Sequence, residues 1–313
     1  YGFLPLLLVF LVVFFSLSSP RFLQVNNFQN ILYNTGILAV VSFGQFFTVL
    51  SGGIDFSNAM MIALASVTFA LSIPLVGIFG AVIAALLACM LFGFLNGFLI
   101  TKFSASPMIV TLGMMWVING VNLILTSGQV VYGIPEYFQW FGNGRVLGLP
   151  ITIIVAVAAF VIFYFLLHNT VFGKNLYALG ANEKAAFLSG INVKKGRVIC
   201  YIICGLCAAI TGLMLTGSLG TGQPSLGLDL AMTNFIAVFV AGVRWGGGEG
   251  SLFAVGMGAL FVAIMQNGLN ILGVSSFIQQ IIIGLVLVVA LTVDIFRTRW
   301  AAGERGRRIF WAG

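Results

Sequence analysis

Ten apolar runs dominate the chain, each separated from the next by a short polar, glycine-containing or proline-containing break. They cover residues 3–18, 31–50, 57–76, 80–100, 107–126, 150–167, 198–217, 230–243, 251–271 and 277–296. A helix needs about 20 mostly apolar residues to cross the hydrocarbon core of a bilayer. The pattern therefore predicts an all-α integral membrane protein of about ten transmembrane helices, forming a single membrane domain over residues 1–313.

Two longer polar stretches interrupt this pattern, at residues 127–149 and 168–197. Lys and Arg concentrate in cytoplasmic loops, and placing both termini in the cytoplasm leaves only Arg21 and Arg145 outside. The inside set is then Lys102, Lys174, Lys184, Lys194, Lys195, Arg197, Arg244, Arg297, Arg299, Arg305, Arg307 and Arg308. We therefore expect cytoplasmic termini, a cytoplasmic loop at 168–197 and a periplasmic loop at 127–149.

Composition supports the bilayer as the solvent of this chain. Hydrophobic residues make up 60% and charged residues 7%, whereas a soluble domain carries about 25% charged residues. The net charge of +7 reflects the orientation bias, so we expect no nucleic acid partner. Cys89, Cys200, Cys204 and Cys207 lie within apolar runs. The last three share a helical face without a nearby His or carboxylate, which favours packing over metal ligation; we expect no metal and no cofactor.

A weak internal similarity relates the two halves of the chain. Residues 94–100 (FLNGFLI) near the end of the fourth run are similar to residues 265–271 (MQNGLNI) near the end of the ninth. Breaks also correspond, since residues 51–53 (SGG) follow the second run and residues 220–224 (GTGQP) follow the seventh. An offset of five spans reverses the direction of equivalent segments, so we expect inverted five-helix repeats, an arrangement common in transporters.

No nucleotide-binding loop is present, because no Gly-x-x-x-x-Gly-Lys is followed by Ser or Thr. The glycine-rich run at residues 246–251 lacks the lysine and lies between two spans, as a tight turn would. We therefore expect no catalytic residues in this chain, and any ATP hydrolysis must come from another polypeptide.

The cytoplasmic loop contains a short helix signal. Asn182 is a favoured N-cap residue, Glu183 suits the first turn of a helix, and Gly190 suits the left-handed C-terminal position. The sequence thus predicts a two-turn helix outside the membrane, with Phe187 and Leu188 needing a partner or the body of the protein to cover them. Two interpretations remain: an interfacial helix resting on lipid, or a docking helix for a cytoplasmic motor subunit.

Several segments resemble one family of membrane proteins. Residues 172–174 (FGK) and 177–193 (YALGANEKAAFLSGINV), residues 51–57 (SGGIDFS), residues 267–277 (NGLNILGVSSF) and Gln223-Pro224 are similar to permease subunits of the bacterial ribose-type ABC importers, which include xylose, galactose and autoinducer-2 permeases. The resemblance spans nearly the whole chain. It implies coupling to an ATPase subunit through the predicted helix, namely Asn182, Glu183, Ala186, Phe187, Leu188, Ser189 and Gly190. It also implies a periplasmic solute-binding protein on the opposite face.

Three positions depart from that family's pattern. Asn58-Ala59-Met60 replaces the usual Val-Gly-Ser, residues 232–236 (MTNFI) replace Glu-Leu-Asp-Ala-Ile, and Asn119-Gly120-Val121 replaces Arg-Gly-Val. The second and third of these departures lose charged residues. They motivate the hypothesis that the chain pairs with a second, different permease chain; a purified complex holding a single permease sequence would contradict it.

Polar side chains within the spans are candidates for a solute path. Ionisable groups inside spans usually mark ion pathways, and no mid-span position carries one. Amides can hydrogen-bond sugar hydroxyls, and equally they can bond helices together. Asp55 follows two glycines at a span boundary, where water is near, and either caps the third span or lines the path. The candidate path residues are Asp55, Asn96, Asn119, Asn234, Gln266, Asn267 and Asn270.

The function predicted from these observations is a permease subunit of an ABC importer in the bacterial inner membrane. It would pass a sugar or similar neutral polyol across a lipid bilayer together with cytoplasmic ATPase subunits, a second permease chain and a periplasmic binding protein. The alternative is a gradient-driven secondary transporter with inverted repeats, which would account for the hydropathy but not for the loop helix.

Overall fold

The computed structural model describes residues 3–301, which are nearly all helical. The helices are α1 (Phe3–Ser18), η1 (Pro20–Leu23), α2 (Val25–Leu50), α3 (Asn58–Phe103), α4 (Pro107–Thr126), α5 (Glu136–Asn143), α6 (Ile151–Asn169), α7 (Val171–Ala181), α8 (Glu183–Leu188), α9 (Val193–Leu219), α10 (Leu230–Val240), α11 (Leu252–Ile271) and α12 (Ser276–Ala301). The predicted cytoplasmic positions of Arg305, Arg307 and Arg308 lie outside the described residues, as do the side chains of Arg297 and Arg299.

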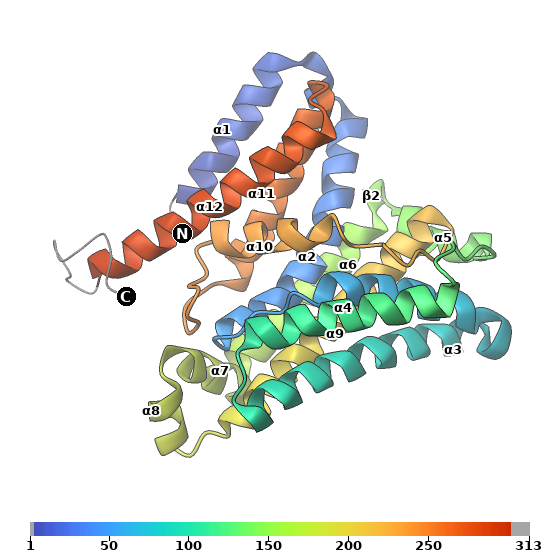
Figure 1. Cartoon of the computed structure of the whole chain (residues 1–313). Helices are drawn as coiled ribbons and strands as arrows, with labels where there is room; N and C mark the ends of the chain where they lie inside the picture. Colours follow the sequence, from blue (N-terminus) through green and yellow to red (C-terminus); the bar gives the residue numbers. More distant parts are fainter. Residues whose placement is uncertain (1–2, 302–313) are drawn as a thin grey trace.

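Helix α3 is a hairpin of two helical limbs. Its 46 residues would measure about 70 Å if straight, more than twice the hydrocarbon thickness of a bilayer. Gly77 interrupts it with φ 68° and ψ 178°, just after Pro74. Beyond that point the chain returns, because the Cys89 thiol bonds the Met61 carbonyl at 3.1 Å and Asn96 bonds Ser57 at 2.7 Å. The ribbon reverses accordingly in Figure 1.

Among the described residues, seven helices are long and apolar enough to cross a membrane, counting the α3 hairpin once. Their burial separates a centre from a periphery. The most apolar stretch of α2 is 83% buried and that of α9 is 67% buried, whereas that of α12 is only 6% buried. Exposed apolar side chains on peripheral helices suit contact with lipid tails. The protein is thus an integral membrane protein with α2 and α9 at its core.

Glycines bring α3 and α9 into close contact. A Cβ at Gly93 of α3 would lie 2.3 Å from the Tyr201 carbonyl oxygen, and one at Gly205 of α9 would lie 2.4 Å from the Cys89 carbonyl oxygen. Small residues let membrane helices approach at the backbone, where dispersion contacts hold them. Cys200, Cys204 and Cys207 are fully buried on α9, as packing residues would be.

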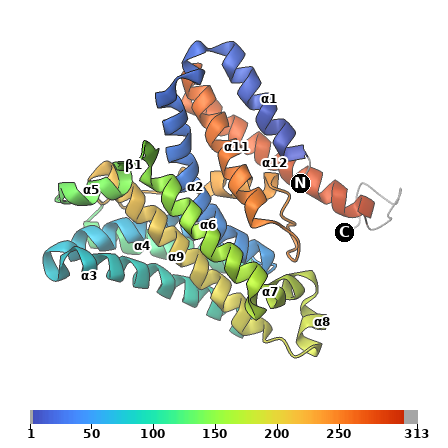
Figure 2. The same cartoon turned by 180° about the vertical axis from the view of Figure 1, so that it is seen from behind.

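The two long polar stretches fold at opposite ends of the bundle (Figures 1 and 2). One end carries α7 and α8. At the other, residues 127–149 form α5 and an antiparallel pair of two-residue strands, β1 (Arg145–Val146) and β2 (Leu149–Pro150). Ordered structure in this stretch, and helix α7, were not predicted from the sequence.

Candidate functional site

Helix α8 is built as its capping residues predict. The Asn182 side-chain oxygen accepts a hydrogen bond from the Ala185 N–H at 3.0 Å, which satisfies one of the free donors of the first turn. Ser189 ends the helix, and Gly190 follows with φ 82°, a left-handed conformation that glycine adopts without strain. The predicted helix is therefore confirmed, with Asn182 and Ser189 as its caps.

The exposed face of α8 carries two large apolar side chains. Ala186 is buried against the protein, but Phe187 is 70% and Leu188 84% exposed. The sequence predicted that either a partner or the body of the protein covers Phe187 and Leu188. The body of the protein does not cover them. A groove of about 1020 Å³ runs beside these two side chains and is also lined by Glu183, Lys184 and Lys194. Helix α8 therefore offers an apolar tip with a charged rim to lipid or to another protein.

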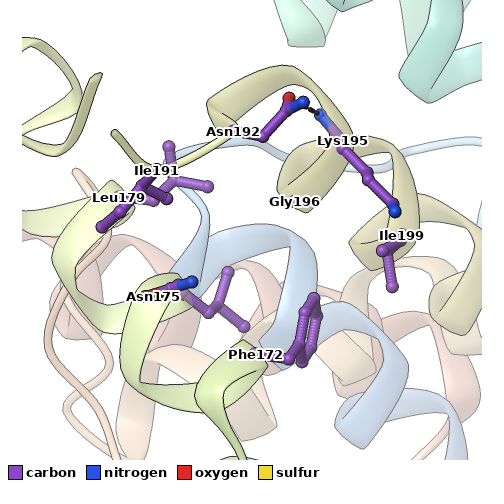
Figure 3. A pocket seen from close by; sticks show the side chains of 9 residues that line it. Phe172, Asn175, Leu179, Ile191, Asn192, Lys195, Gly196 and Ile199 are labelled. Carbon is purple, nitrogen blue, oxygen red and sulfur yellow. Dashed lines mark hydrogen bonds between the residues drawn. The ribbon is translucent and has the colours of Figure 1, made fainter. Parts of the chain in front are cut away.

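A second, smaller hollow separates α7 from the first turns of α9. It encloses about 290 Å³, and Figure 3 shows Phe172, Asn175 and Leu179 of α7 facing Lys195 and Ile199 of α9 across it. At its rim, the Asn192 side-chain oxygen accepts a hydrogen bond from the Lys195 N–H at 3.0 Å. This bond caps α9, which begins at Val193. The predicted span began five residues later, at Val198.

One ion pair ties α8 to the helix that follows it. Arg197 Nη2 lies 2.9 Å from Glu183 Oε2, with the arginine side chain 15% and the glutamate 56% exposed. The same nitrogen lies 3.4 Å from the Ser51 carbonyl oxygen at the end of α2. Arg197 thus connects α8, α9 and the end of α2.

Inside the bundle, polar side chains from four helical segments meet in what we call the buried polar cluster. Its members have no exposed surface and are Gln45, Asp55, Ser57, Asn58, Asn96 and Asn234.

The cluster joins α2, both limbs of α3, and α10. Asp55 Oδ1 accepts from the N–H and hydroxyl of Ser57, whose Oγ accepts from Asn96 Nδ2 at 2.7 Å. Asn58 bonds Gln45 at 2.7 Å and accepts from Asn234 at 3.2 Å. Three candidate path residues, Asp55, Asn96 and Asn234, therefore come together here.

The expectation that Asp55 lies near water is wrong. Its carboxylate is fully buried because α9 covers the segment, with the Tyr201 hydroxyl donating to the Ile54 carbonyl at 3.0 Å. Asp55 accepts from Ser57, the residue just before α3, and the N-terminus of that helix has no side-chain capping bond. Gln45, Ser57 and Asn58 were not identified as candidates, although a Gln within an apolar run was a signal for the first.

The remaining candidates lie elsewhere. Asn267 donates to Asn27 at 2.8 Å, and Gln279 donates to Asn270 at 2.8 Å, at the far end of α2 from the cluster. Asn27 and Gln45 are 18 residues apart on α2, which corresponds to roughly 27 Å along the helix. Gln266 is half-buried on α11, and Asn119 is half-buried on α4. The candidates thus occupy at least two depths rather than one site.

The role of the Asp55 carboxylate can be tested by two substitutions. Asp55→Asn keeps the Oδ1 acceptor and should leave the thermal unfolding midpoint of the purified chain in detergent near wild type. Asp55→Ala strands the N–H and hydroxyl of buried Ser57 and should destabilise the fold by about 1–3 kcal/mol. If Asp55→Asn is as unstable as Asp55→Ala, the negative charge and not the acceptor is what the fold requires.

Comparisons with known proteins give a consistent result. The profile of the family described as "Branched-chain amino acid transport system / permease component" matches residues 27–291. The chain is 40% identical over 290 residues to the ribose import permease protein RbsC of Bacillus subtilis (strain 168), covering 92% of this chain and 90% of that protein.

Two relatives from Escherichia coli (strain K12) carry other sugars in their names. The D-allose transport system permease protein AlsC is 32% identical over 297 residues, covering 94% of this chain and 91% of that protein. The L-arabinose transport system permease protein AraH is 33% identical over 297 residues, with 94% and 90% covered. No solved structure matches the chain.

Proposed function

The chain belongs to the family of branched-chain amino acid transport system permease components, and from this premise we propose that it is the permease subunit of an ABC importer for a monosaccharide or similar neutral polyol. It is a multi-pass protein of the bacterial inner membrane, and its relatives are transport components rather than enzymes. Ribose, D-allose and L-arabinose in the relatives' names motivate the solute class. Which sugar it carries is left to the binding protein.

The observation that carries the coupling role is the exposed apolar tip of α8. Phe187 and Leu188 face away from the protein on a helix that is capped at both ends. Exposing such side chains in water is unfavourable, and a large exposed apolar patch marks an interaction site. The proposed partner is a cytoplasmic ATPase subunit that grips α8, with Asn182, Glu183, Ala186, Ser189 and Gly190 forming the rest of the helix and its caps.

The proposed topology has ten spans and both termini in the cytoplasm. The spans are α1, α2, residues 58–76 and 78–103 of α3, α4, α6, α9, α10, α11 and α12. Support comes from α7 and α8, which carry the basic loop at the opposite end from α5. In Figure 1 the N-terminal end of α1 also lies on the side of α7 and α8. Helix α10 has 11 residues, about half of a full span, so it would cross together with the non-helical residues beside it.

Inverted repeats are supported by the breaks that follow α2 and α9. Residues 51–57 pass back into the bundle to form part of the buried polar cluster. Residues 220–229 also pack inward, since a Cβ at Gly227 would lie 2.6 Å from the Ala59 carbonyl oxygen. Matching interruptions at corresponding spans are typical of repeat-built transporters.

The proposed solute path uses polar groups at two depths. In the buried polar cluster, Asp55 Oδ2, Asn96 Oδ1 and Asn234 Oδ1 have no donor among the described residues, and sugar hydroxyls are donors. The cluster is closed in this conformation, so it would meet solute only after α10 moves. Asn267, Asn270 and Gln266 of α11 and Asn119 of α4 would line the path at other levels.

Alternating access follows from the partners. A loaded periplasmic binding protein docks on the α5 side, and ATP binding to the motor moves α8. The two permease chains then change between outward-open and inward-open conformations. ATP can drive this change only because it binds the two conformations with different affinity. We propose a different permease chain as the partner, on the strength of Asn58, Asn119 and residues 232–236.

Reconstitution distinguishes this function from the secondary transporter. Proteoliposomes holding the chain alone should take up no labelled ribose, D-allose or L-arabinose under any ion gradient. Adding the ATPase, binding protein and any second permease encoded beside it should give uptake that requires ATP. Gradient-driven uptake by the chain alone would establish the alternative instead.

A further inference from the structure

Two side chains on the cytoplasmic end of α9 hold the segment at residues 51–57. Arg197 and Tyr201 are one helical turn apart and so share a face of α9. Arg197 Nη2 lies 3.4 Å from the Ser51 carbonyl oxygen, and the Tyr201 hydroxyl donates to the Ile54 carbonyl at 3.0 Å. The segment that links α2 to α3 is therefore fastened to α9 at both of these points.

The same arginine also fastens α8. Its Nη2 lies 2.9 Å from Glu183 Oε2 in the first turn of that helix. A guanidinium is always charged and offers five donors in a rigid plane, so it can serve two acceptors from different elements at once. With its side chain only 15% exposed, Arg197 is a shielded cation between the exposed helix α8 and residues 51–57.

Residues 50–53 pack closely against α7 and α9. A Cβ at Gly53 would lie 2.5 Å from the Tyr201 hydroxyl oxygen, and one at Gly180 of α7 would lie 2.0 Å from the Leu50 carbonyl oxygen. Interiors packed in this way transmit displacement rather than absorbing it. Residues 51–57 include Asp55 and Ser57 of the buried polar cluster, and the next residue, Asn58, accepts a hydrogen bond from Asn234 of α10.

We propose that Arg197 is a positioning residue that transmits motion of α8 to residues 51–57, and through them to the buried polar cluster and α10. This inference rests on the proposed function, because it takes the ATPase to move α8. It assigns to the Glu183–Arg197 pair a role in coupling, whereas a partly exposed ion pair adds little to stability.

The test measures ATP hydrolysis and solute uptake in parallel on the reconstituted full complex. Arg197→Met removes both connections, and Glu183→Ala removes only the one to α8. Both variants should assemble with the ATPase, since Phe187 and Leu188 are unchanged. In Arg197→Met the basal ATP hydrolysis should stay within about twofold of wild type. In both variants hydrolysis should lose its stimulation by loaded binding protein, while uptake per ATP falls at least tenfold for Arg197→Met and severalfold for Glu183→Ala.

Two further variants make the result specific. If the pair acts as one connection, Glu183→Ala combined with Arg197→Met should be no worse than Arg197→Met alone. The matched control is Arg244→Met. Arg244 forms an ion pair with Glu249 at 3.1 Å within the neighbouring cytoplasmic turn, and removing it should leave uptake per ATP unchanged.

Wild-type uptake per ATP in Glu183→Ala would overturn the inference, and because Glu183 is mostly exposed this variant is expected to fold. An equal loss in Arg244→Met would also overturn it, since any cytoplasmic ion pair would then matter alike. Failure of the wild-type complex to couple uptake to ATP would instead overturn the proposed function. The two failures are therefore distinguishable.

Discussion

Replacing Phe187 and Leu188 together by aspartate is expected to leave the chain folded in the membrane and unable to retain an ATPase subunit. The two side chains are 70% and 84% exposed, and exposed substitutions usually change stability by no more than about 0.5 kcal/mol. Fold and membrane insertion should therefore survive, while the surface offered to the motor changes from apolar to acidic.

The size of the effect follows from the apolar area that docking would cover. Burying one such side chain contributes about 1.5–3 kcal/mol. Losing two would remove about 3 kcal/mol or more, which weakens affinity by at least about a hundredfold. Placing two carboxylates in a pocket shaped for apolar groups adds a desolvation cost. ATP-dependent uptake should consequently fall to background.

The measurement is co-purification of the ATPase with the tagged chain in nanodiscs, followed by uptake in proteoliposomes. Val171→Asp is a matched control, because Val171 is 74% exposed at the same end of the bundle but begins α7, where an acidic residue suits the helix dipole. That variant should retain the ATPase. Full retention by Phe187→Asp/Leu188→Asp would mean that α8 rests on lipid and that the motor docks elsewhere.

Helix α8 could be predicted because its signals are local. The Asn182 cap and the left-handed Gly190 act within the helix they bound, so no distant contact was needed to recognise them. The reversal within α3 was equally accessible. Apolar length allows one crossing per about 20 residues, and Gly77 stands where the predicted third and fourth spans part.

Helix α5 could not be predicted, because its signals are not local. Helix α5 is held by contacts with the end of α9, such as the hydrogen bond from Asn143 to the Ser218 carbonyl at 2.9 Å. A Cβ at Gly142 would lie 2.1 Å from the Ser218 backbone nitrogen. Asn143 and Ser218 are 75 residues apart in the chain, so the local sequence around α5 could not predict this contact.

The buried polar cluster shows how far amides can be interpreted from sequence. Asn96 and Asn234 were identified as polar positions in apolar runs, but only the fold reveals that Asn96 bonds Asp55 and Ser57 and that Asn234 bonds Asn58. A side-chain amide can bond a helix or a solute equally well. Sequence therefore located the groups, and only three-dimensional proximity separates them from Asn267 and Asn270.

Replacing Gly205 at the contact between α3 and α9 is expected to destabilise the fold. Gly205→Ala would place a Cβ 2.4 Å from the Cys89 carbonyl oxygen and 2.9 Å from its carbonyl carbon. Backbone atoms cannot rotate away as a flexible side chain can, so the two helices must separate. Overpacking of this kind costs about 1–3 kcal/mol, and the larger Gly205→Val should exceed that range and lower the yield of folded protein.

Gly113→Ala is the matched control, because Gly113 also lies within a membrane helix but a Cβ there meets nothing within 4 Å. Replacing it should leave stability unchanged or raise it by up to about 1 kcal/mol through helix propensity. The measurement is the thermal unfolding midpoint of purified protein in detergent. Helix α9 also carries Arg197 and Tyr201, so a separated interface should loosen residues 51–57 and reduce uptake per ATP as well. Stability equal to Gly113→Ala would show that α3 and α9 do not meet at the backbone, and that residues 51–57 are not held against α9 as tightly as transmission from α8 requires.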